Sequence, residues 1–173
     1  VITNIAMDHI GLVNSIDEVY DEVSAVPQSI GNGITILNYD DELVRKLEAK
    51  NPFYWSMDNN SCELYFNDGI FYNGDLIIKK EDLPFSSNHF VQNILSAVGA
   101  CINLGIDLNQ INEGVKTYRA LNRRFAKLND EPLIIDDFAH NPDGIKNTIK
   151  ETIKLVNGSQ KLHVVCAIRG SRG

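Results

Sequence analysis

The sequence predicts an α/β protein organised in two parts. Strand-like and helix-like runs alternate at the beginning of the chain, which is typical of a parallel sheet with helical crossovers. Residues 53–80 differ, because short aromatic and β-branched runs there are separated by Asn, Asp and Gly. From residue 131 the alternation of strand and helix resumes. A chain of 173 residues that is 43% hydrophobic can bury one ordinary core or two small ones.

The first element is a short buried strand over residues 1–6. The segment "NSIDEVYDEVSAV" follows with apolar residues at helical spacing, so it predicts a helix that is capped by Asn14 or Ser15. Pro27 should end or kink this helix, since proline lacks the N–H that a helix interior needs.

The next segment, "GITILNYDDELVRKLEAKN", predicts a strand, an Asp-rich corner and a helix. The order β-α-β-α up to this point indicates a parallel sheet. Residues 53–80 are expected to form an antiparallel meander. Within them, "GIFYNGD" has the glycine spacing of a phosphate loop but continues with Asp75 instead of Lys-Ser/Thr, so we interpret it as a hairpin turn.

A long helix should open at "SSNHF" and close at Gly105, and a second helix should lie near residues 110–118. The polar stretch around 119–130 is the predicted domain boundary, which gives domains over 1–119 and 120–173.

The second domain is expected to begin with the strand "PLIIDDF". A helix through Ile145 to Val156 and a stop at Gly158 should follow, and "LHVVCAI" should form the next strand. Strand, helix and strand in this order again indicate parallel pairing.

Composition excludes several classes of protein. The formal net charge of −7 argues against binding to a nucleic-acid backbone, and no apolar stretch approaches the roughly 18 residues of a membrane span. No signal peptide is recognisable, and the three cysteines are odd in number and far apart. Reduced thiols in a cytoplasmic protein are the simplest interpretation. Because both ends lie in or beside strand-like runs, we expect this chain to be part of a longer one.

The stretch "IIDDFAHNPDGIK" concentrates polar groups at the end of a predicted strand. Asn141 suits the N-cap of the following helix and Pro142 its first position. Asp136 and Asp137 would then lie at the carboxyl end of a parallel strand, where open α/β sheets bind ligands. A carboxylate there can accept hydrogen bonds from both hydroxyls of a ribose. The alternative is a capped turn with solvated acids.

Asp8 and His9 follow the first strand in "NIAMDHIG". A neutral imidazole there can ligate a divalent cation, although a half-buried histidine that only forms hydrogen bonds is the commoner case.

Two further patterns suit a nucleotide. Asn93 lies one turn after His89 on the long helix, and its amide offers both a donor and an acceptor to the edge of an adenine. Arg123 and Arg124 lie in the polar boundary, where a planar guanidinium suits a phosphate oxygen. The alternatives are an ordinary polar stripe and a solvated pair of arginines.

Together these patterns resemble the Mur ligase family of ATP-dependent amide-forming enzymes. The segments are, in order, "TNIAMDHIG", "NHFVQNILSA", "RRF" and "IDDFAHNPDGIK". The wording is most similar to the cyanophycin-synthetase branch, also at "ILNYDDELV", and the resemblance covers nearly the whole chain. It implies the later part of a Mur-ligase-like central ATPase domain, followed by a truncated Rossmann-like α/β C-terminal domain that closes over ATP.

The resemblance also implies a role for each matching residue: Mg²⁺ binding for His9, the adenine for Asn93, the ATP phosphates for Arg124, the ribose for Asp137, and neighbouring positions over the nucleotide for His140 and Asn141.

Three departures from the family accompany this resemblance. The glycine-rich "GTNGKT" loop does not occur in these residues, so we expect them alone to be inactive. Ser24 stands where many members have a carbamylated lysine, which leaves a second metal site in doubt unless Asp21 or Glu22 substitutes. The first asparagine of the usual "HNxxN" helix is Phe90 here.

The resemblance implies a ligase that couples ATP cleavage to amide formation. A carboxylate substrate would form an acyl-phosphate, and an amine would then displace phosphate. One alternative is a Mur-like ligase that closes an intramolecular amide on a nickel tetrapyrrole in methanogens. Another is a non-catalytic nucleotide-binding module.

Overall fold

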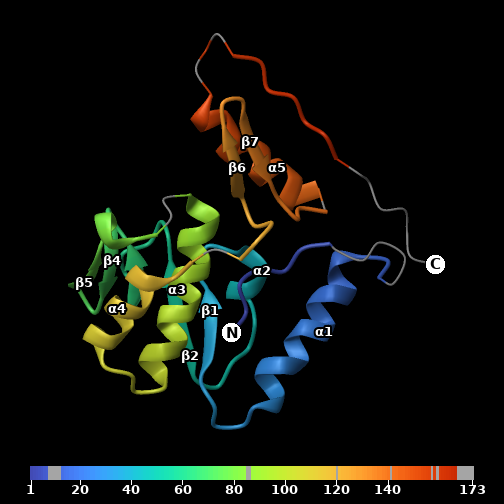
Figure 1. The fold of residues 1–173 in the computed structure, drawn as a ribbon. Helices are drawn as coiled ribbons and strands as arrows, with labels where there is room; N and C mark the ends of the chain where they lie inside the picture. The colour runs from blue at the N-terminus through green and yellow to red at the C-terminus, as the bar shows by residue number, and fades with distance from the viewer. Residues whose placement is uncertain are drawn as a thin grey trace. The chain divides into compact units, whose positions relative to one another are not determined.

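The computed structural model describes residues 1–7, 13–84, 87–119, 121–140, 142–156, 158 and 160–166. The chain divides into two compact units, Val1–Tyr118 and Arg119–Gly173. Figure 1 shows the helices and strands of each unit.

A five-stranded mixed sheet forms the centre of the first unit. β1 (Thr35–Asn38), β2 (Pro52–Ser56) and β3 (Leu64–Phe66) run parallel to one another. β4 (Gly69–Tyr72) and β5 (Asp75–Lys79) continue the sheet in antiparallel fashion. The predicted mixed α/β fold is confirmed.

One face of the sheet is covered by α3 (Asn88–Asn103) and α4 (Leu108–Thr117), both visible beside the strands in Figure 1. Gly99 allows a close approach, because a Cβ atom there would lie 3.2 Å from Ile36 Cγ2 and 3.2 Å from Phe53 Cε1. The largest buried cluster among the described residues forms between this helix face and the strands.

The opposite face packs against α1 (Ile16–Ser29) and α2 (Glu42–Arg45). Leu37 of β1 is fully buried in this second cluster, since successive strand residues point to opposite faces. Pro27 was predicted to end or kink its helix, and it does not end it, because α1 continues to Ser29.

Several local signals are confirmed. The Ser15 hydroxyl caps α1 by accepting a hydrogen bond from Glu18 N–H at 3.2 Å. Gly105 follows the end of α3 with a positive φ of 76°. Asn73 and Gly74 form the tight turn between β4 and β5, with φ values of 50° and 90°, so "GIFYNGD" is a hairpin.

The strand predicted over residues 1–6 is reduced to a single bridge. Ile2 pairs in parallel with Leu37, and no ladder continues from it in the described residues. Side chains hold the following residues in place of the ladder: Asn38 donates to Thr3 O at 2.8 Å, and Asp41 accepts from Ile5 N–H at 3.3 Å.

The antiparallel meander predicted over 53–80 is correct only from β3 onward, because β2 and β3 are parallel. Parallel strands need a return crossover, and here it is short because the strands overlap only at Trp55–Leu64 and Ser56–Tyr65. The chain therefore has little distance to travel back.

The second unit contains a two-stranded antiparallel hairpin, β6 (Ala126–Asp130) and β7 (Leu133–Asp136), followed by α5 (Pro142–Leu155). β6 lies inside the stretch predicted as a polar boundary, and β7 pairs with it instead of forming the predicted parallel pair. α5 begins at Pro142 as predicted.

Residues 161–166 form neither a helix nor a strand, so the strand predicted over 162–168 is not found in its described part. A strand is stable when a neighbour pairs its N–H and C=O groups, and Val165 is 98% exposed. Within the ranges described, no helix combines the length and apolarity needed to cross a bilayer.

Candidate functional site

Three of the predicted site residues come together around the end of β7: Arg124, Asp137 and His140. They belong to the second unit and lie within 17 residues of one another in the chain. The β6–β7 hairpin returns the chain, so that residues 123–125 lie beside 136–138.

The Asp137 carboxylate is hydrogen-bonded through both of its oxygens. Phe125 N–H donates to Oδ2 at 2.7 Å, and Ala139 N–H donates to Oδ1 at 2.7 Å. The Thr148 hydroxyl of α5 lies 3.1 Å from Oδ1. One carboxylate thus connects the loop before β6, the chain after β7 and α5. A hydrogen bond to a charged group typically contributes about 1.5–3 kcal/mol.

The loop that carries Arg124 has an unusual backbone. Arg123 and Phe125, on either side of Arg124, have φ values of 63° and 49°. The left-handed region costs residues with a Cβ roughly 1–2 kcal/mol each. Phe138 N–H donates to Arg123 O at 2.8 Å, and Asp137 accepts from Phe125 as described. The strained loop is therefore held by the residues that follow β7.

The two arginines share an aromatic ring but differ in their ion pairs. Arg123 Nε lies 3.4 Å from Asp136 Oδ2, and this ion pair is open to solvent. Both guanidinium groups lie over the Phe138 ring, with Cζ 5.6 Å from the centroid for Arg123 and 5.2 Å for Arg124. In the described part of the chain no carboxylate forms an ion pair with Arg124. A cation on an aromatic face remains able to bind an anion.

His140 is held beside the same ring. Its Nδ1 lies 3.0 Å from Phe138 O, and the two rings meet edge to face with centroids 5.2 Å apart. A carbonyl oxygen can only accept, so Nδ1 must carry the proton in this contact. The Nε2 atom of the neutral ring is then an acceptor.

The cluster suits a nucleotide on chemical grounds. A planar guanidinium matches phosphate oxygens. The two oxygens of a carboxylate have about four acceptor positions, and backbone N–H groups occupy two of those of Asp137. The single hydrogen of the Thr148 hydroxyl is shared between Oδ1 at 3.1 Å and Gly144 O at 3.0 Å, so at least one position remains for a sugar hydroxyl.

The fit to a metal ion is less complete. His9, the predicted Mg²⁺ ligand, lies outside the described residues. Among the residues that are described, no three His, Cys, Asp or Glu side chains come together as a metal site. The Ser24 hydroxyl donates to Asp21 O at 2.7 Å, and the Asp21 and Glu22 side chains are exposed on α1.

Two other residues, Asn93 and Asn141, were predicted to lie near the nucleotide. Asn93 belongs to the first unit, where it is exposed on α3 on the side away from the sheet. Asn141, the predicted cap of α5, lies outside the described residues.

The carboxyl edge of the parallel sheet contains two polar residues that sequence reasoning did not single out. Asn38, at the end of β1, donates to Thr3 O and accepts from Asp40 N–H at 2.9 Å. Asp41 caps α2 with one oxygen and accepts from Ile5 N–H with the other. The signal was present in "NYDDE", since an aspartate between a strand and a helix is typical of an N-cap.

The same edge contains a half-buried acid. Asp40 accepts hydrogen bonds from the Ser56 hydroxyl and from Met57 N–H at 2.6 Å. Burial, with smaller effects of Asp40 and Glu63, raises the pKa of the nearby Cys62 thiol to about 11. Cys62 is therefore a neutral thiol at physiological pH and not an activated nucleophile.

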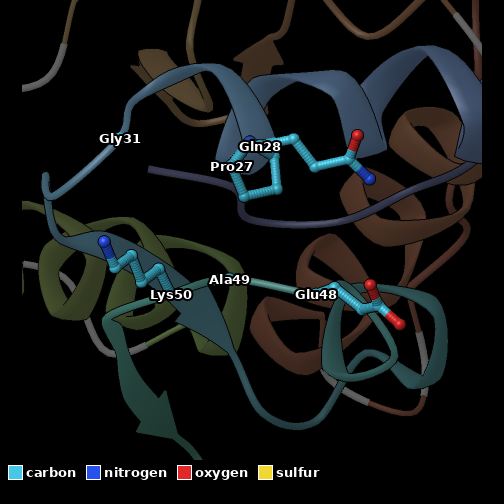
Figure 2. A pocket seen from close by; sticks show the side chains of 6 residues that line it. All are labelled: Pro27, Gln28, Gly31, Glu48, Ala49 and Lys50. Atoms are coloured by element: carbon cyan, nitrogen blue, oxygen red, sulfur yellow. The ribbon is translucent and has the colours of Figure 1, made fainter.

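A shallow pocket of about 460 Å³ lies elsewhere on the first unit. Figure 2 shows Pro27 and Gln28 in the last turn of α1 facing the segment Glu48–Lys50. None of its lining residues is among the predicted nucleotide ligands, and the pocket adds nothing to the site.

Comparison with known proteins identifies the class. The family model described as Mur ligase middle domain matches residues 1–101. The chain belongs to the Mur ligase family.

Individual relatives agree with this family. The chain is 33% identical over 159 residues to a UDP-N-acetylmuramate–L-alanine ligase of Lactococcus lactis subsp. cremoris (strain SK11). It is 30% identical over 166 residues to the protein of the same name from Streptococcus pneumoniae (strain P1031). Each match covers 86% of this chain but 36% of the relative, so the chain spans little more than a third of their length.

Solved structures share the fold. A pseudomurein peptide ligase type C from Methanothermus fervidus matches 92% of this chain and 41% of its own, with a TM-score of 0.74 and 19% identity. MurF from Acinetobacter baumannii matches 90% of this chain and 37% of its own, with a TM-score of 0.73 and 18% identity.

Proposed function

We propose that the full-length protein is an ATP-dependent ligase that joins a carboxylate to an amine. The carboxylate oxygen attacks the γ-phosphorus of ATP, and ADP leaves. The amine nitrogen then attacks the acyl carbon, loses a proton and expels phosphate, which leaves an amide. Residues 1–119 would be the later part of the central ATPase domain and residues 120–173 the first part of the C-terminal ligase domain.

The observation that carries this proposal, beside the family, is Arg124. Its guanidinium is presented on a fixed loop, and no described carboxylate neutralises it. Such a cation would hold the γ-phosphate and stabilise the charge that develops on its oxygens. Bound Mg²⁺, held by His9, would supply further positive charge at the phosphates.

Other residues would hold the rest of the nucleotide. The Asn93 amide would pair with the edge of the adenine, and Asp137 would accept from a ribose hydroxyl with its remaining position. His140 and Asn141 would lie over the nucleotide. Because a ligase of this kind uses ATP, we propose that the protein is located in the cytoplasm.

For the substrates, the relatives' name suggests a UDP-linked muramate carboxylate and a small amino acid as the first pair to test. Two predictions point to other substrates. One is the resemblance to the cyanophycin-synthetase branch, and the other is closure of an intramolecular amide on a nickel tetrapyrrole. A non-catalytic nucleotide-binding module is the alternative of a different class.

The test follows the oxygen atoms. In the full-length enzyme, a carboxylate substrate labelled with ¹⁸O should transfer one labelled oxygen to the released phosphate, because that oxygen bridges carbon and phosphorus in the acyl-phosphate. ATP binding without turnover across carboxylate and amine panels would favour the binding module. Turnover with unlabelled phosphate would exclude the acyl-phosphate.

A further inference from the structure

The Asp137 carboxylate is directed mainly at its own chain. Its Oδ2 accepts from Phe125 N–H at 2.7 Å, and its Oδ1 accepts from Ala139 N–H at 2.7 Å. A carboxylate whose principal task was to bind a ligand would be expected to keep most of its acceptor positions open.

The position of the Phe125 bond gives it a consequence for Arg124. Phe125 has a φ of 49° and Arg123 a φ of 63°, a conformation that side-chain-bearing residues rarely adopt unless their surroundings impose it. The bond from Phe125 to Asp137 and the bond from Phe138 N–H to Arg123 O, at 2.8 Å, hold the two sides of this short loop. Without the Asp137 carboxylate, the N–H of Phe125 would lose its hydrogen-bond acceptor.

The ring that follows Asp137 completes the arrangement. Phe138 lies beneath the Arg124 guanidinium at 5.2 Å, and His140 packs against the edge of the same ring. The segment from Asp137 to His140 thus contacts the Arg124 side chain through Phe138 and the backbone on both sides of Arg124, while Arg124 N–H itself donates to Leu121 O at 3.2 Å.

We propose that Asp137 is a positioning residue for Arg124. Its carboxylate holds the left-handed loop, and the loop presents the guanidinium to the terminal phosphate of a nucleoside triphosphate. Asp137 therefore controls discrimination between triphosphate and monophosphate, beyond any contact that it makes to a ribose. This inference rests on the proposed function, because it assumes that Arg124 meets the γ-phosphate.

The experiment compares nucleotides that differ in their phosphates. Dissociation constants for a non-hydrolysable ATP analogue, ADP and AMP are measured by calorimetry on the full-length enzyme and on Asp137→Ala, Arg124→Ala and the double variant. Removing a charge-assisted contact to the γ-phosphate should weaken the ATP analogue by about 10- to 100-fold. In Asp137→Ala this loss should exceed the loss for AMP by about tenfold. The double variant should be little worse than Arg124→Ala.

Thr148→Val is the matched control. It removes the α5 hydroxyl from Oδ1 but leaves both backbone bonds of the carboxylate, so the ratio of ATP-analogue to AMP affinity should stay near the wild-type value. If Asp137→Ala does not fold, Asp137→Asn takes its place, since the amide keeps one acceptor oxygen and should show the same pattern with a smaller loss.

Equal losses for all three nucleotides, or additive effects of Asp137→Ala and Arg124→Ala, would overturn the inference and leave Asp137 as a direct ribose ligand. Failure of the proposed function has a different signature, because the wild-type enzyme would then bind neither ATP nor its analogue, or would bind ATP without turning it over with any carboxylate and amine.

Discussion

Replacement of Asp41 by alanine should loosen the segment that leads from Ile2 towards His9. One Asp41 oxygen accepts from Leu43 N–H at 3.0 Å and Val44 N–H at 2.8 Å, which caps α2. The other accepts from Ile5 N–H at 3.3 Å. Loss of the cap costs about 1 kcal/mol. Loss of the acceptor for Ile5 costs about 1 kcal/mol more.

Asp107→Ala provides the matched control. Asp107 caps α4 by accepting from Asn109 N–H at 2.9 Å, and this substitution should cost only the cap, about 1 kcal/mol. Thermal melting of the full-length enzyme measures the two losses. Amide hydrogen exchange gives the local effect: Ile5 should exchange about fivefold faster in Asp41→Ala, which corresponds to about 1 kcal/mol, and at the wild-type rate in Asp107→Ala.

The Mg²⁺ dependence of activity tests whether Asp41 also affects the predicted Mg²⁺ ligand His9. Because the chain from Ile5 continues to Asp8 and His9, Asp41→Ala should raise the Mg²⁺ concentration that gives half-maximal activity, and Asp107→Ala should not. Unchanged protection of Ile5 in Asp41→Ala would refute the reasoning. The same shift in Mg²⁺ dependence in both variants would show a general loss of stability instead.

Four further predictions concern single residues. His9→Ala should abolish the Mg²⁺ dependence of activity while the melting temperature stays within a few degrees; an early-melting variant that keeps this dependence would show a structural histidine. Gly114→Ala should stabilise the protein by about 0.8–1 kcal/mol, because nothing lies within 4 Å of the added Cβ in α4. Gly99→Val should destabilise it by about 1–3 kcal/mol through overpacking, as denaturant titration can measure. Iodoacetamide at pH 8 should modify Cys62 more slowly than the exposed Cys166, and its rate at Cys62 should rise towards pH 11; equal rates would contradict the raised pKa of the half-buried Cys62 thiol.

Elements whose signals are local were predictable from the sequence. The end of α3 at Gly105 and the Asn73–Gly74 turn depend on backbone conformations that particular residue types favour. Strand partners were harder to predict from the sequence, because pairing depends on the path of the connecting loop. The parallel pairing of β2 with β3 and the presence of β6 were missed for this reason.

The candidate site shows the same division between residues and contacts. Arg124, Asp137 and His140 were predicted from side-chain chemistry and from the resemblance, and the β6–β7 hairpin brings them together. The bond from Phe125 N–H to Asp137 was not predictable, because the two left-handed residues, Arg123 and Phe125, are neither glycine nor asparagine. Asn38 and Asp41 were overlooked because their hydrogen bonds reach back more than 30 residues to Thr3 and Ile5.

The left-handed loop ties the placement of Arg124 to the folding of the second unit. A strained backbone persists only where surrounding contacts outweigh its cost. For Phe125 those contacts come through Asp137, whose other oxygen is held by Ala139 and by Thr148 of α5. Any change that frees Phe125 N–H or Ala139 N–H from the Asp137 carboxylate should therefore also release the arginine. If Arg124 binds phosphate as proposed, phosphate recognition then depends on the assembled strand and loop, and not on Arg124 alone.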